Sequence, residues 1–315
     1  MAQPLRTQQG AAVVMALFIV VLCTLAVSPL IWNLFATAKT ISVTAARDQA
    51  ELVSRSGVDW ARVILREDAR VSTTDTLTEP WAVPLAESRI NEGLMRKDEN
   101  ATNADTREVV LTGRIEDAQG RFNLRNLGLD NPARAEWLAG FAKLCDLLGV
   151  NPQDRERIAG TVARMFKPQT PTGQDKPAAD RQPALPPAIR WEDFRGRYGI
   201  GEDTWNQLRP HVVLLPRATP INANTTTPEV LYAALEPLSY AQAQSVISQR
   251  DRVSFRNIND FKAALGPNIQ ANNDLISVNT AFFLIEGTAQ VEQALIRTRA
   301  LLERKDQKVL VIWRQ

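Results

Sequence analysis

The chain has 315 residues, with 37 lysines and arginines against 35 acidic residues, and a formal net charge of +2. This length suits about two domains. The balanced charge gives no electrostatic argument for a nucleic acid or an acidic substrate as partner. A single histidine, His211, almost excludes histidine triads and multi-histidine metal sites. The two cysteines, Cys23 in an apolar run and Cys145 in a helical pattern, exclude a disulfide framework.

An uncharged apolar run from Ala11 to Ala38 follows a short polar leader that contains one basic residue, Arg6. The run is longer than the roughly 20 residues that span a membrane. Three interpretations are open: a secretory signal cut after the small residues Ala36–Ala38, an uncleaved anchor, or a segment cut at its edge and retained. A cleavable signal has an apolar region of about 7–15 residues, so the length argues against the first.

The helical pattern continues beyond the apolar run, with Ile41, Ala45 and Leu52 near one face. No glycine or proline occurs between Pro29 and Gly57. We therefore expect one long helix that leaves the membrane and continues into a soluble domain. Pro29 should kink this helix, because proline removes a backbone donor and clashes with the preceding turn. The continuity favours a segment that is trimmed and retained.

The pattern of residues 85–95 predicts a short helix. The next segment predicts a β-hairpin. Val109–Ile115 forms its first strand, Gln119-Gly120 supplies the turn, and Phe122 and Leu124 alternate on the return strand.

Helical patterns dominate the middle of the chain. We expect helices at residues 133–148, ended by Gly149, and at residues 152–166, with Asn151 as the N-cap. Residues 167–187 are rich in proline and polar side chains and predict a long exposed loop.

Strand-like apolar runs occupy residues 282–287 and 308–315. The stretch between them, residues 289–304, is ambiguous. It lacks glycine and proline, as a helix would, yet it also alternates as a strand would, with Ala294 and Ile296 on one face.

Candidate catalytic or ligand residues are few. His211 precedes an apolar run and is interpreted as structural, and residues 199–203 (GIGED) as a turn and not a phosphate loop. Three acidic pairs in or near loops could offer oxygen ligands to calcium, although none matches an EF-hand loop. These pairs are Asp98-Glu99, Glu116-Asp117 and Glu202-Asp203. A solvated surface is the simpler interpretation of each pair.

Residues 221–266 resemble the helix-hairpin-helix modules with which competence proteins bind DNA phosphates. Those hairpins carry glycines that expose backbone N–H groups to phosphate, and lysines follow them. Here the hairpin, residues 236–242 (EPLSYAQ), has neither glycine nor a basic residue. A membrane-tethered, competence-type DNA-binding protein is therefore the alternative function, and a secreted hydrolase, without a nucleophile motif, is weaker still.

Several segments, in their order and spacing, resemble the minor pseudopilin family of type II secretion called general secretion pathway protein K. The resemblance covers almost the whole chain. The matching segments are QQG-AAVVM, GRIEDAQGRFNLRNL, INANTTTPEVL, ISQRDRVSFRNINDF and the ending VNTAFFLIEG…VLVIWRQ.

The resemblance implies an α+β, pilin-like fold, in which a long N-terminal helix packs on an antiparallel β-sheet. A large, mostly α-helical domain is inserted between strands, and the pilin context favours strand for residues 289–304. The implied organisation is a leader peptide at 1–10, the transmembrane half of the helix at 11–38, its soluble half with the first part of the β domain at 39–126, the inserted helical domain at 127–274, and the completing strands at 275–315.

The resemblance also implies that prepilin peptidase cuts after Gly10 and methylates the new amino terminus at Ala11. Most pilins carry glutamate at the fifth mature position, where it can pair with the terminal ammonium of a neighbouring subunit. An unpaired carboxylate in hydrocarbon is costly, so that pair would favour stacking below another subunit. Here the fifth mature residue is Met15. Both this missing charge and the large insertion suit a subunit at the filament tip.

The implied function is a non-enzymatic minor pseudopilin at the tip of the periplasmic pseudopilus. It would nucleate or cap assembly with the I-type and J-type minor pseudopilins and support export of folded proteins across the outer membrane. Further implied partners are the major pseudopilin, prepilin peptidase and the inner-membrane assembly platform, with no nucleic acid. The implied location is the bacterial inner membrane, single-pass, with the soluble domain in the periplasm. Calcium is possible at the family level, without assigned ligands.

Overall fold

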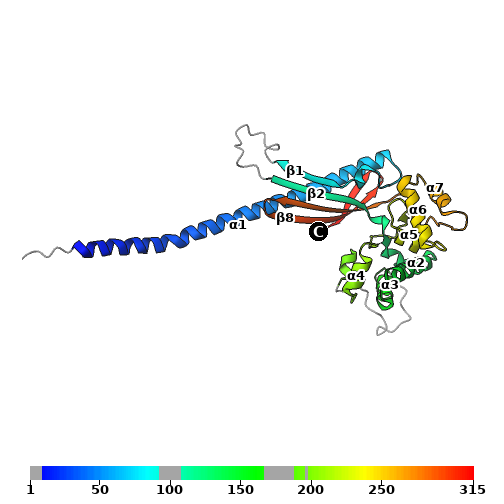
Figure 1. Ribbon diagram of the computed structural model, residues 1–315, viewed down its shortest axis with the longest axis horizontal. Coiled ribbons are helices and arrows are strands. Elements are labelled where there is room, and N and C mark those ends of the chain that lie inside the picture. The colour runs from blue at the N-terminus through cyan, green and yellow to red at the C-terminus, as the bar shows by residue number, and fades with distance from the viewer. Residues whose placement is uncertain (1–8, 92–107, 167–187, 196–197) are drawn as a thin grey trace, which may run out of the picture. The chain divides into compact units, whose positions relative to one another are not determined.

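The computed structural model describes residues 9–91, 108–166, 188–195 and 198–315, and Figure 1 shows its elements. The chain divides into two compact units. The first comprises Met1–Arg55, Glu87–Leu111 and Thr288–Arg297, and the second comprises Ser56–Ala86, Thr112–Gly287 and Thr298–Gln315.

The longest element is the helix α1, Gln9–Val71, which confirms the expected long N-terminal helix. The helix is continuous through Pro29. In the first unit, Ala46 and Ala50 of α1 are buried against Val109 and Val291. Small alanine side chains let the helix backbone approach the strands closely, so this part of α1 packs tightly on the sheet.

One five-stranded sheet has the strand order β1-β2-β7-β8-β9. Its strands are β1 Leu85–Asn91, β2 Glu108–Asp117, β7 Phe282–Val291, β8 Ala294–Lys305 and β9 Lys308–Arg314. In the second unit, Val58, Ala61 and Leu65 of α1 pack against a sheet face that includes Phe283 and Ile285. The alternation of side chains along a strand places these two sheet residues on the same face.

Two-residue turns join the last three strands. Glu292 begins the turn between β7 and β8 with a φ of 52°, and Asp306 begins the turn between β8 and β9 with a φ of 55°. Such turns connect antiparallel strands, and their positive φ matches the strand twist. The ambiguous stretch 289–304 is therefore strand, as the pilin context favoured.

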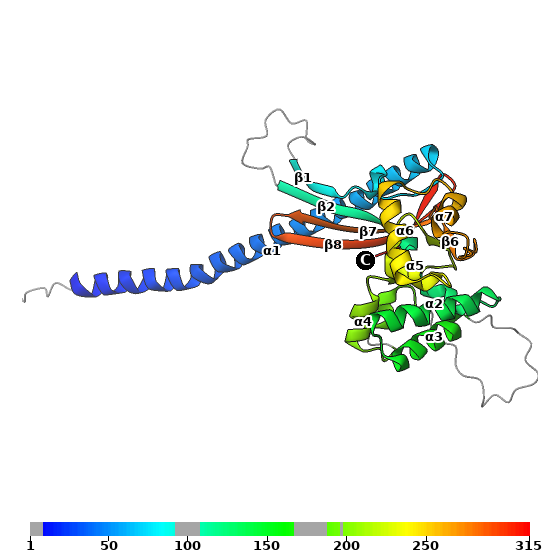
Figure 2. The same ribbon diagram turned by 45° about the vertical axis from the view of Figure 1, so that its right-hand side comes forward.

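The chain between β2 and β7 is mostly helical, and Figure 2 shows these helices clearly. They are α2 Ala133–Leu148, α3 Pro152–Phe166, α4 Glu202–Leu208, α5 Pro228–Ala234, α6 Tyr240–Arg252 and α7 Ile258–Leu265. The expected helix boundaries are confirmed for α2 and α3. Gly149 ends α2 with a φ of 69°, and the Asn151 side chain accepts a hydrogen bond from the Gln153 N–H at 2.9 Å.

Two short pairs of parallel strands also stabilise this helical region. β3 Phe122–Asn123 pairs with β4 Val212–Val213, and β5 Ile221–Asn222 pairs with β6 Ile276–Ser277. Phe122 then packs edge-to-face on Trp137 of α2, with ring centroids 5.2 Å apart.

The expected hairpin at residues 109–124 is wrong. Its first strand exists as β2, but a 3₁₀ turn over Ala118–Gly120 follows, and Phe122 pairs with Val212 instead of returning along β2. The reason is burial: Phe122 is fully buried in the core of the helical region, and removing its ring from water stabilises this arrangement.

The short helix expected at residues 85–95 is also wrong over its described part, because Leu85–Asn91 forms the strand β1. Pairing with β2 satisfies the backbone groups of β1 that face it, and tertiary pairing of this kind overrides local helix propensity. The expected loop at 167–187 and the pair Asp98-Glu99 lie outside the described residues. The domain boundaries, including 127–274, remain predictions.

The glycines of the helical region provide a test of its packing. A Cβ at Gly140 of α2 would lie 2.5 Å from the Ala233 carbonyl oxygen of α5, whereas a Cβ at Gly160 of α3 meets nothing within 4 Å. We expect Gly140→Ala to lower the free energy of unfolding by about 1–3 kcal/mol through overpacking. Gly160→Ala should raise it by about 0.5–1 kcal/mol.

Urea denaturation of the detergent-solubilised chain, followed by tryptophan fluorescence, measures both changes. Equal effects of the two substitutions would contradict the close approach of α2 and α5.

Candidate functional site

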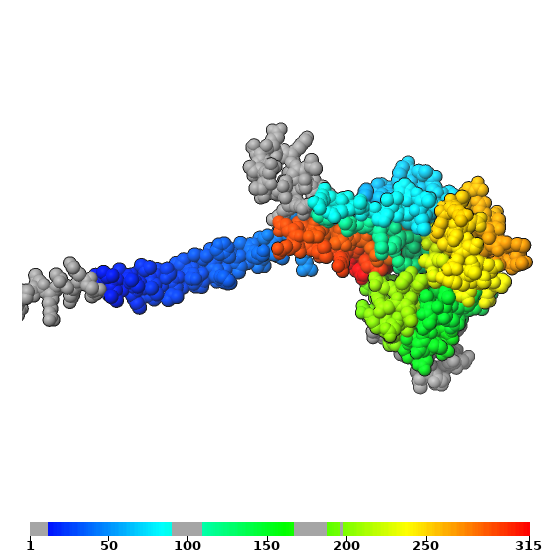
Figure 3. Space-filling view, in the orientation of Figure 1, coloured from blue at the N-terminus to red at the C-terminus, as the bar shows by residue number. Residues whose placement is uncertain are grey.

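The apolar half of α1 is uncovered. Every side chain from Ala12 to Ile41 is exposed, and among the described residues α1 is the one helix long and apolar enough to cross a membrane. The blue atoms of this segment carry no covering layer on the face shown in Figure 3. The Thr24 hydroxyl donates within the helix to the Val20 and Val21 carbonyls at 3.0 and 2.8 Å, so it needs no water. This surface suits the hydrocarbon of a bilayer.

The residues predicted to be processed lie at the start of this helix. Gly10 and Ala11 belong to the first turn of α1, where N–H groups lack helical partners and helices fray. Met15 is 69% exposed on the apolar surface. Cleavage and methylation at Gly10 and Ala11 remain predictions, as does the role of Met15.

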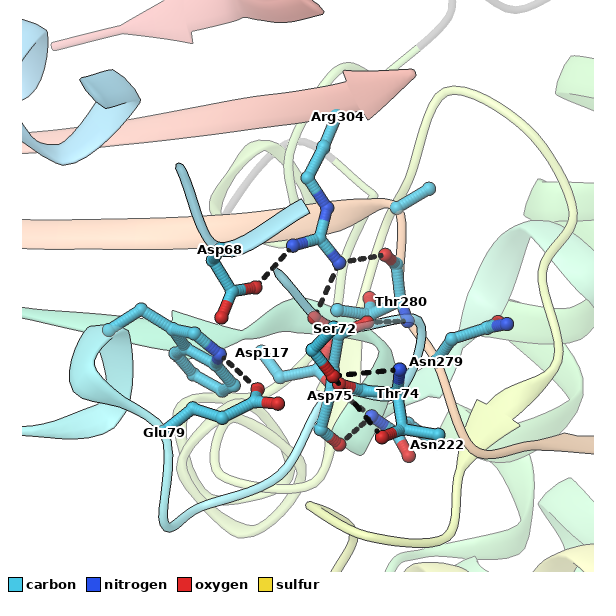
Figure 4. A network of polar contacts seen from close by, with 12 residues as sticks. Asp68, Ser72, Thr74, Asp75, Glu79, Asp117, Asn222, Asn279, Thr280 and Arg304 are labelled. Carbon is cyan, nitrogen blue, oxygen red and sulfur yellow. Dashed lines mark hydrogen bonds and ion pairs between the residues drawn. The ribbon is translucent and has the colours of Figure 1, made fainter. Parts of the chain in front are cut away.

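A cluster of polar residues lies buried in the second unit, and we call it the polar junction. Its members are Asp68, Asp75, Asp117, Asn222, Thr280 and Arg304, with Figure 4 showing their contacts. They come from the end of α1, the loop after it, the end of β2, β5, the approach to β7, and β8. The junction therefore joins segments that are distant in sequence.

Arg304 is the centre of the polar junction. Its guanidinium donates to the Asp68 carboxylate at 2.6 Å, to the Asp75 carboxylate, and to the Thr280 carbonyl at 3.1 Å (Figure 4). It also lies over the ring of Phe283 at 4.7 Å. The side chains of Asp68, Asp75 and Arg304 are all at least nine-tenths buried. Bonds of this kind, between ions removed from water, are strong only when every partner is in place.

Asp75 also binds the backbone around it. Its second carboxylate oxygen accepts from the Thr280 N–H at 2.7 Å, and its carbonyl accepts from the Asn222 side chain at 3.1 Å. The same Asn222 amide donates to Asp117 at 2.7 Å, and the Thr225 hydroxyl donates to Asp117 at 2.6 Å. One amide thus links the loop after α1 to the end of β2.

Burial raises the pKa values of the acids in the polar junction. The pKa of Asp68 rises to about 6, because of burial and then the neighbouring Glu79, against the opposing effect of Arg304. Burial also raises the pKa of Asp117 to about 6, although hydrogen bonds from Thr225, Thr280 and Asn222 favour its charged form. For Asp75 the direction is also upward, with burial as the main cause and Arg304 opposing it. One guanidinium does not fully compensate three buried carboxyl groups.

Calcium does not fit this cluster. Asp68, Asp75 and Glu79 carry carboxylate oxygens within 4.8 Å of one another, and among the described residues they form the one such acidic trio. Asp68 and Asp75 bind the Arg304 guanidinium, while Glu79 accepts from the Trp81 indole at 2.7 Å. A cation of the protein already occupies the position that a metal ion would need.

Two of the acidic pairs named from the sequence, Glu116-Asp117 and Glu202-Asp203, lie among the described residues. Glu116 forms ion pairs with Arg114 at 2.7 Å and Arg121 at 2.5 Å, and Glu202 pairs with Arg195 at 2.7 Å. These contacts agree with ordinary surface pairing. Asp117 is the exception: its side chain is part of the polar junction.

Two further sequence expectations concern the helical region. His211 is partly buried, its carbonyl accepts from the Phe122 N–H at 2.8 Å, and burial lowers the pKa of its imidazole. Both observations agree with a structural histidine. Gly199 has a φ of 68° just before α4, and Glu202 and Asp203 already form the first turn of that helix, so residues 199–203 lead the chain into α4.

The hairpin between α5 and α6, which resembles a DNA-binding hairpin in sequence, is bound to α2. Lys143 of α2 donates to the Leu235 carbonyl at 3.0 Å and lies 4.4 Å from the centre of the Tyr232 ring. The Ser239 side chain and Gln242 close the hairpin with a reciprocal cap at the start of α6. The residues of this hairpin serve packing and capping.

The fold now defines a class of protein. A long N-terminal helix, apolar and uncovered over its first half and packed over its second half on an antiparallel sheet, is a pilin-like subunit. Comparison with known proteins narrows the class.

Two models described as type II secretion system (T2SS), protein K match residues 120–217 and 221–279. Type II secretion system protein K of Pseudomonas aeruginosa is 26% identical over a 328-residue alignment, covering 98% of this chain and 93% of that protein. The chain belongs to the type II secretion system protein K family, whose members are structural minor pseudopilins.

A solved structure supports the fold. A chain from the crystal structure of the GspK-GspI-GspJ complex of the enterotoxigenic Escherichia coli type 2 secretion system matches with a TM-score of 0.65 at 20% identity. The match covers 88% of this chain and 98% of that chain.

Removing the Arg304 charge tests the polar junction. We expect Arg304→Met to lower the free energy of unfolding by about 3–5 kcal/mol at pH 7.5, because it leaves Asp68 and Asp75 buried without a counter-charge. The matched control is Arg70→Met, which breaks an exposed pair with Glu67 and should cost less than about 1 kcal/mol. Urea denaturation measures both, and a loss below about 1 kcal/mol for Arg304→Met would contradict the role of Arg304.

The raised pKa of Asp117 predicts a pH dependence. A carboxyl group with a higher pKa in the folded state stabilises the fold when protonated, and this stability is lost as pH rises through about 6. Asp117→Asn removes the titration, so the stability of the parent relative to this variant should fall by up to about 3 kcal/mol between pH 4 and pH 7.

Urea denaturation at several pH values measures this difference. The contribution of His211 to the pH dependence cancels, because both proteins contain this residue. Asp203→Asn, which changes an exposed carboxylate, should reproduce the parent profile. A difference between parent and Asp117→Asn that stays constant or grows with pH would contradict the raised pKa.

Proposed function

We propose that this minor pseudopilin occupies the tip of the periplasmic pseudopilus, where it nucleates or caps assembly and supports export of folded proteins across the outer membrane. The proposed role is non-enzymatic. It places α1 in the bacterial inner membrane as a single span, with the rest of the chain in the periplasm.

The observation that carries the tip position is Met15. It lies on the uncovered apolar surface of α1, at the position where most pilins carry glutamate. A glutamate there would need the terminal ammonium of a neighbouring subunit, because an unpaired carboxylate in hydrocarbon is costly. A subunit with methionine needs no such partner above it, and so can be the first in the filament.

The helical region supports the same position. Six helices follow one another between β2 and β7 among the described residues, and a pilin-like domain carrying this additional mass would obstruct a subunit stacked above it. The proposed organisation keeps residues 127–274 as the inserted domain, between the β domain at 39–126 and the strands at 275–315.

The proposed partners are the I-type and J-type minor pseudopilins, in keeping with the complex in which the matched E. coli chain was crystallised. The major pseudopilin, the inner-membrane assembly platform and prepilin peptidase are further proposed partners. Exposed apolar side chains on the second half of α1, such as Trp60 and Val63, offer contact area for neighbouring helices.

Processing at the leader junction is the first test. We expect mass spectrometry of the chain purified from membranes to show an amino terminus of N-methylated Ala11, because prepilin peptidase would cut after Gly10 and the apolar helix would be retained. Gly10→Val should leave the full leader attached. A mature terminus at Lys39 would indicate an ordinary secretory signal and contradict the proposal.

A further inference from the structure

The edge strand β9 is unusually apolar for its position. It is the last strand in the sheet order β1-β2-β7-β8-β9, so no described strand pairs with its outer edge. Three consecutive residues are exposed: Leu310 by 53%, Val311 by 41% and Ile312 by 36%. Soluble proteins usually protect such an edge with charge, proline or a cover, and β9 carries charge only at its ends, Lys308 and Arg314.

The register of β9 shows which backbone groups point outward. Val309 lies opposite Arg304, and its carbonyl accepts from the Arg62 side chain of α1 at 3.1 Å, so this carbonyl points away from β8. Backbone direction alternates along a strand, so the N–H and C=O of Val311 also point away from β8. Val311 thus offers one outward donor and one outward acceptor.

A β-bulge directly follows Val311 on β9. Leu302 lies opposite Val311 while Leu301 lies opposite Trp313, which leaves Ile312 as the additional residue on β9. A bulge bends and twists the strand, so the regular outer edge is short and centred on Val311. Apolar contact with Leu310 and Ile312 would supply much of the binding energy of any added strand.

The surroundings of this edge are basic. Lys305, Lys308 and Arg314 are exposed on β8 and β9. Arg62 contacts Val309, and Arg66, one helical turn later and exposed, lies on the same flank of α1. Among the acids near this edge in sequence, Asp59 binds Arg62 at 2.8 Å and Glu303 binds Arg217 at 3.2 Å. Asp306 is exposed in the turn before Lys308, so the exposed lysines and arginines outnumber this acid.

This charge pattern disfavours a second copy of the chain as the occupant. Antiparallel pairing of two β9 strands about Val311 places Lys308 of each copy opposite Arg314 of the other. Like charges directly opposite each other in a sheet are destabilising. The same basic ends favour a strand with acidic residues at its ends.

We propose that β9 binds an extended segment of a neighbouring pseudopilin, with an apolar centre and acidic residues at its ends, which adds a strand to the sheet. The identity of the neighbour rests on the proposed function. The recognition combines outward backbone groups at Val311, apolar contact at Leu310 and Ile312, and charge pairing at Lys308 and Arg314.

Photo-crosslinking in cells tests this proposal with the full chain and the complete secretion system. Benzoylphenylalanine at position 310 should crosslink to an acidic-ended, extended segment of another pseudopilin, identified by mass spectrometry of the joined peptides. The same probe at Trp60, exposed on α1, reports assembly with pseudopilins independently of β9. Crosslinks from 60 without crosslinks from 310 would overturn the β9 proposal alone, and failure at both positions would overturn the proposed function as well.

The identity of the molecule crosslinked to position 310 is a second test of the proposal. A crosslink from position 310 to a second copy of this chain, to lipid or to a helical segment would overturn the proposal. If position 310 crosslinks to an extended segment of another pseudopilin, Val311→Lys should reduce the yield of that crosslink at least tenfold, because lysine on an edge strand opposes the addition of another strand. Val253→Lys changes another exposed apolar residue, in the loop after α6, and should leave the yield unchanged.

Charge reversal separates recognition from folding. Lys308→Glu together with Arg314→Glu keeps the apolar residues and should also reduce the crosslink at least tenfold, with no change in the thermal unfolding midpoint. A crosslink at full yield in this double variant, or in Val311→Lys, would overturn the proposed recognition.

Discussion

The second unit of this protein depends on one buried guanidinium. Arg304 lies 236 residues from Asp68 and 229 residues from Asp75 in sequence, yet it binds both carboxylates. A buried charge is tolerated only when its partners are fixed around it. The end of α1, the loop after it and β8 must therefore meet at one geometry, and the contact of α1 with the sheet follows from that requirement.

The same polar junction explains how a long helical region can interrupt a small sheet. The chain leaves β2 at Asp117 and approaches β7 at Thr280, and both residues bind members of the junction. Asn222, from within the helical region, contacts Asp117 and the Asp75 backbone. Because entry and exit lie at one buried cluster, the helical region closes on itself with its own core and leaves the strand pairing of β2 and β7 intact.

The periodicity and cap residues of the sequence predicted the helices whose formation depends on nearby residues. The apolar run and its continuation predicted α1, and cap residues such as Asn151 and Gly149 predicted the ends of α2 and α3. The hairpin after Val109 failed because Phe122 pairs with Val212, far along the chain. Arg304 carried no signal of its own, since the partners that make a buried charge important are visible only in the folded chain. Gly10, Ala11 and Met15 were named from the family resemblance, and their proposed roles in processing and assembly remain predictions.

Family membership and fold are compatible with a minor pseudopilin anywhere in the filament, and the tip position is the central claim. Electron microscopy of sheared pseudopili, labelled with gold-coupled antibody against the helical region between β2 and β7, measures it directly. If the subunit occupies the tip, gold should lie at one end of each labelled filament and nowhere along its length. Gold distributed along the filaments would contradict a subunit that lacks a place for a neighbour above it.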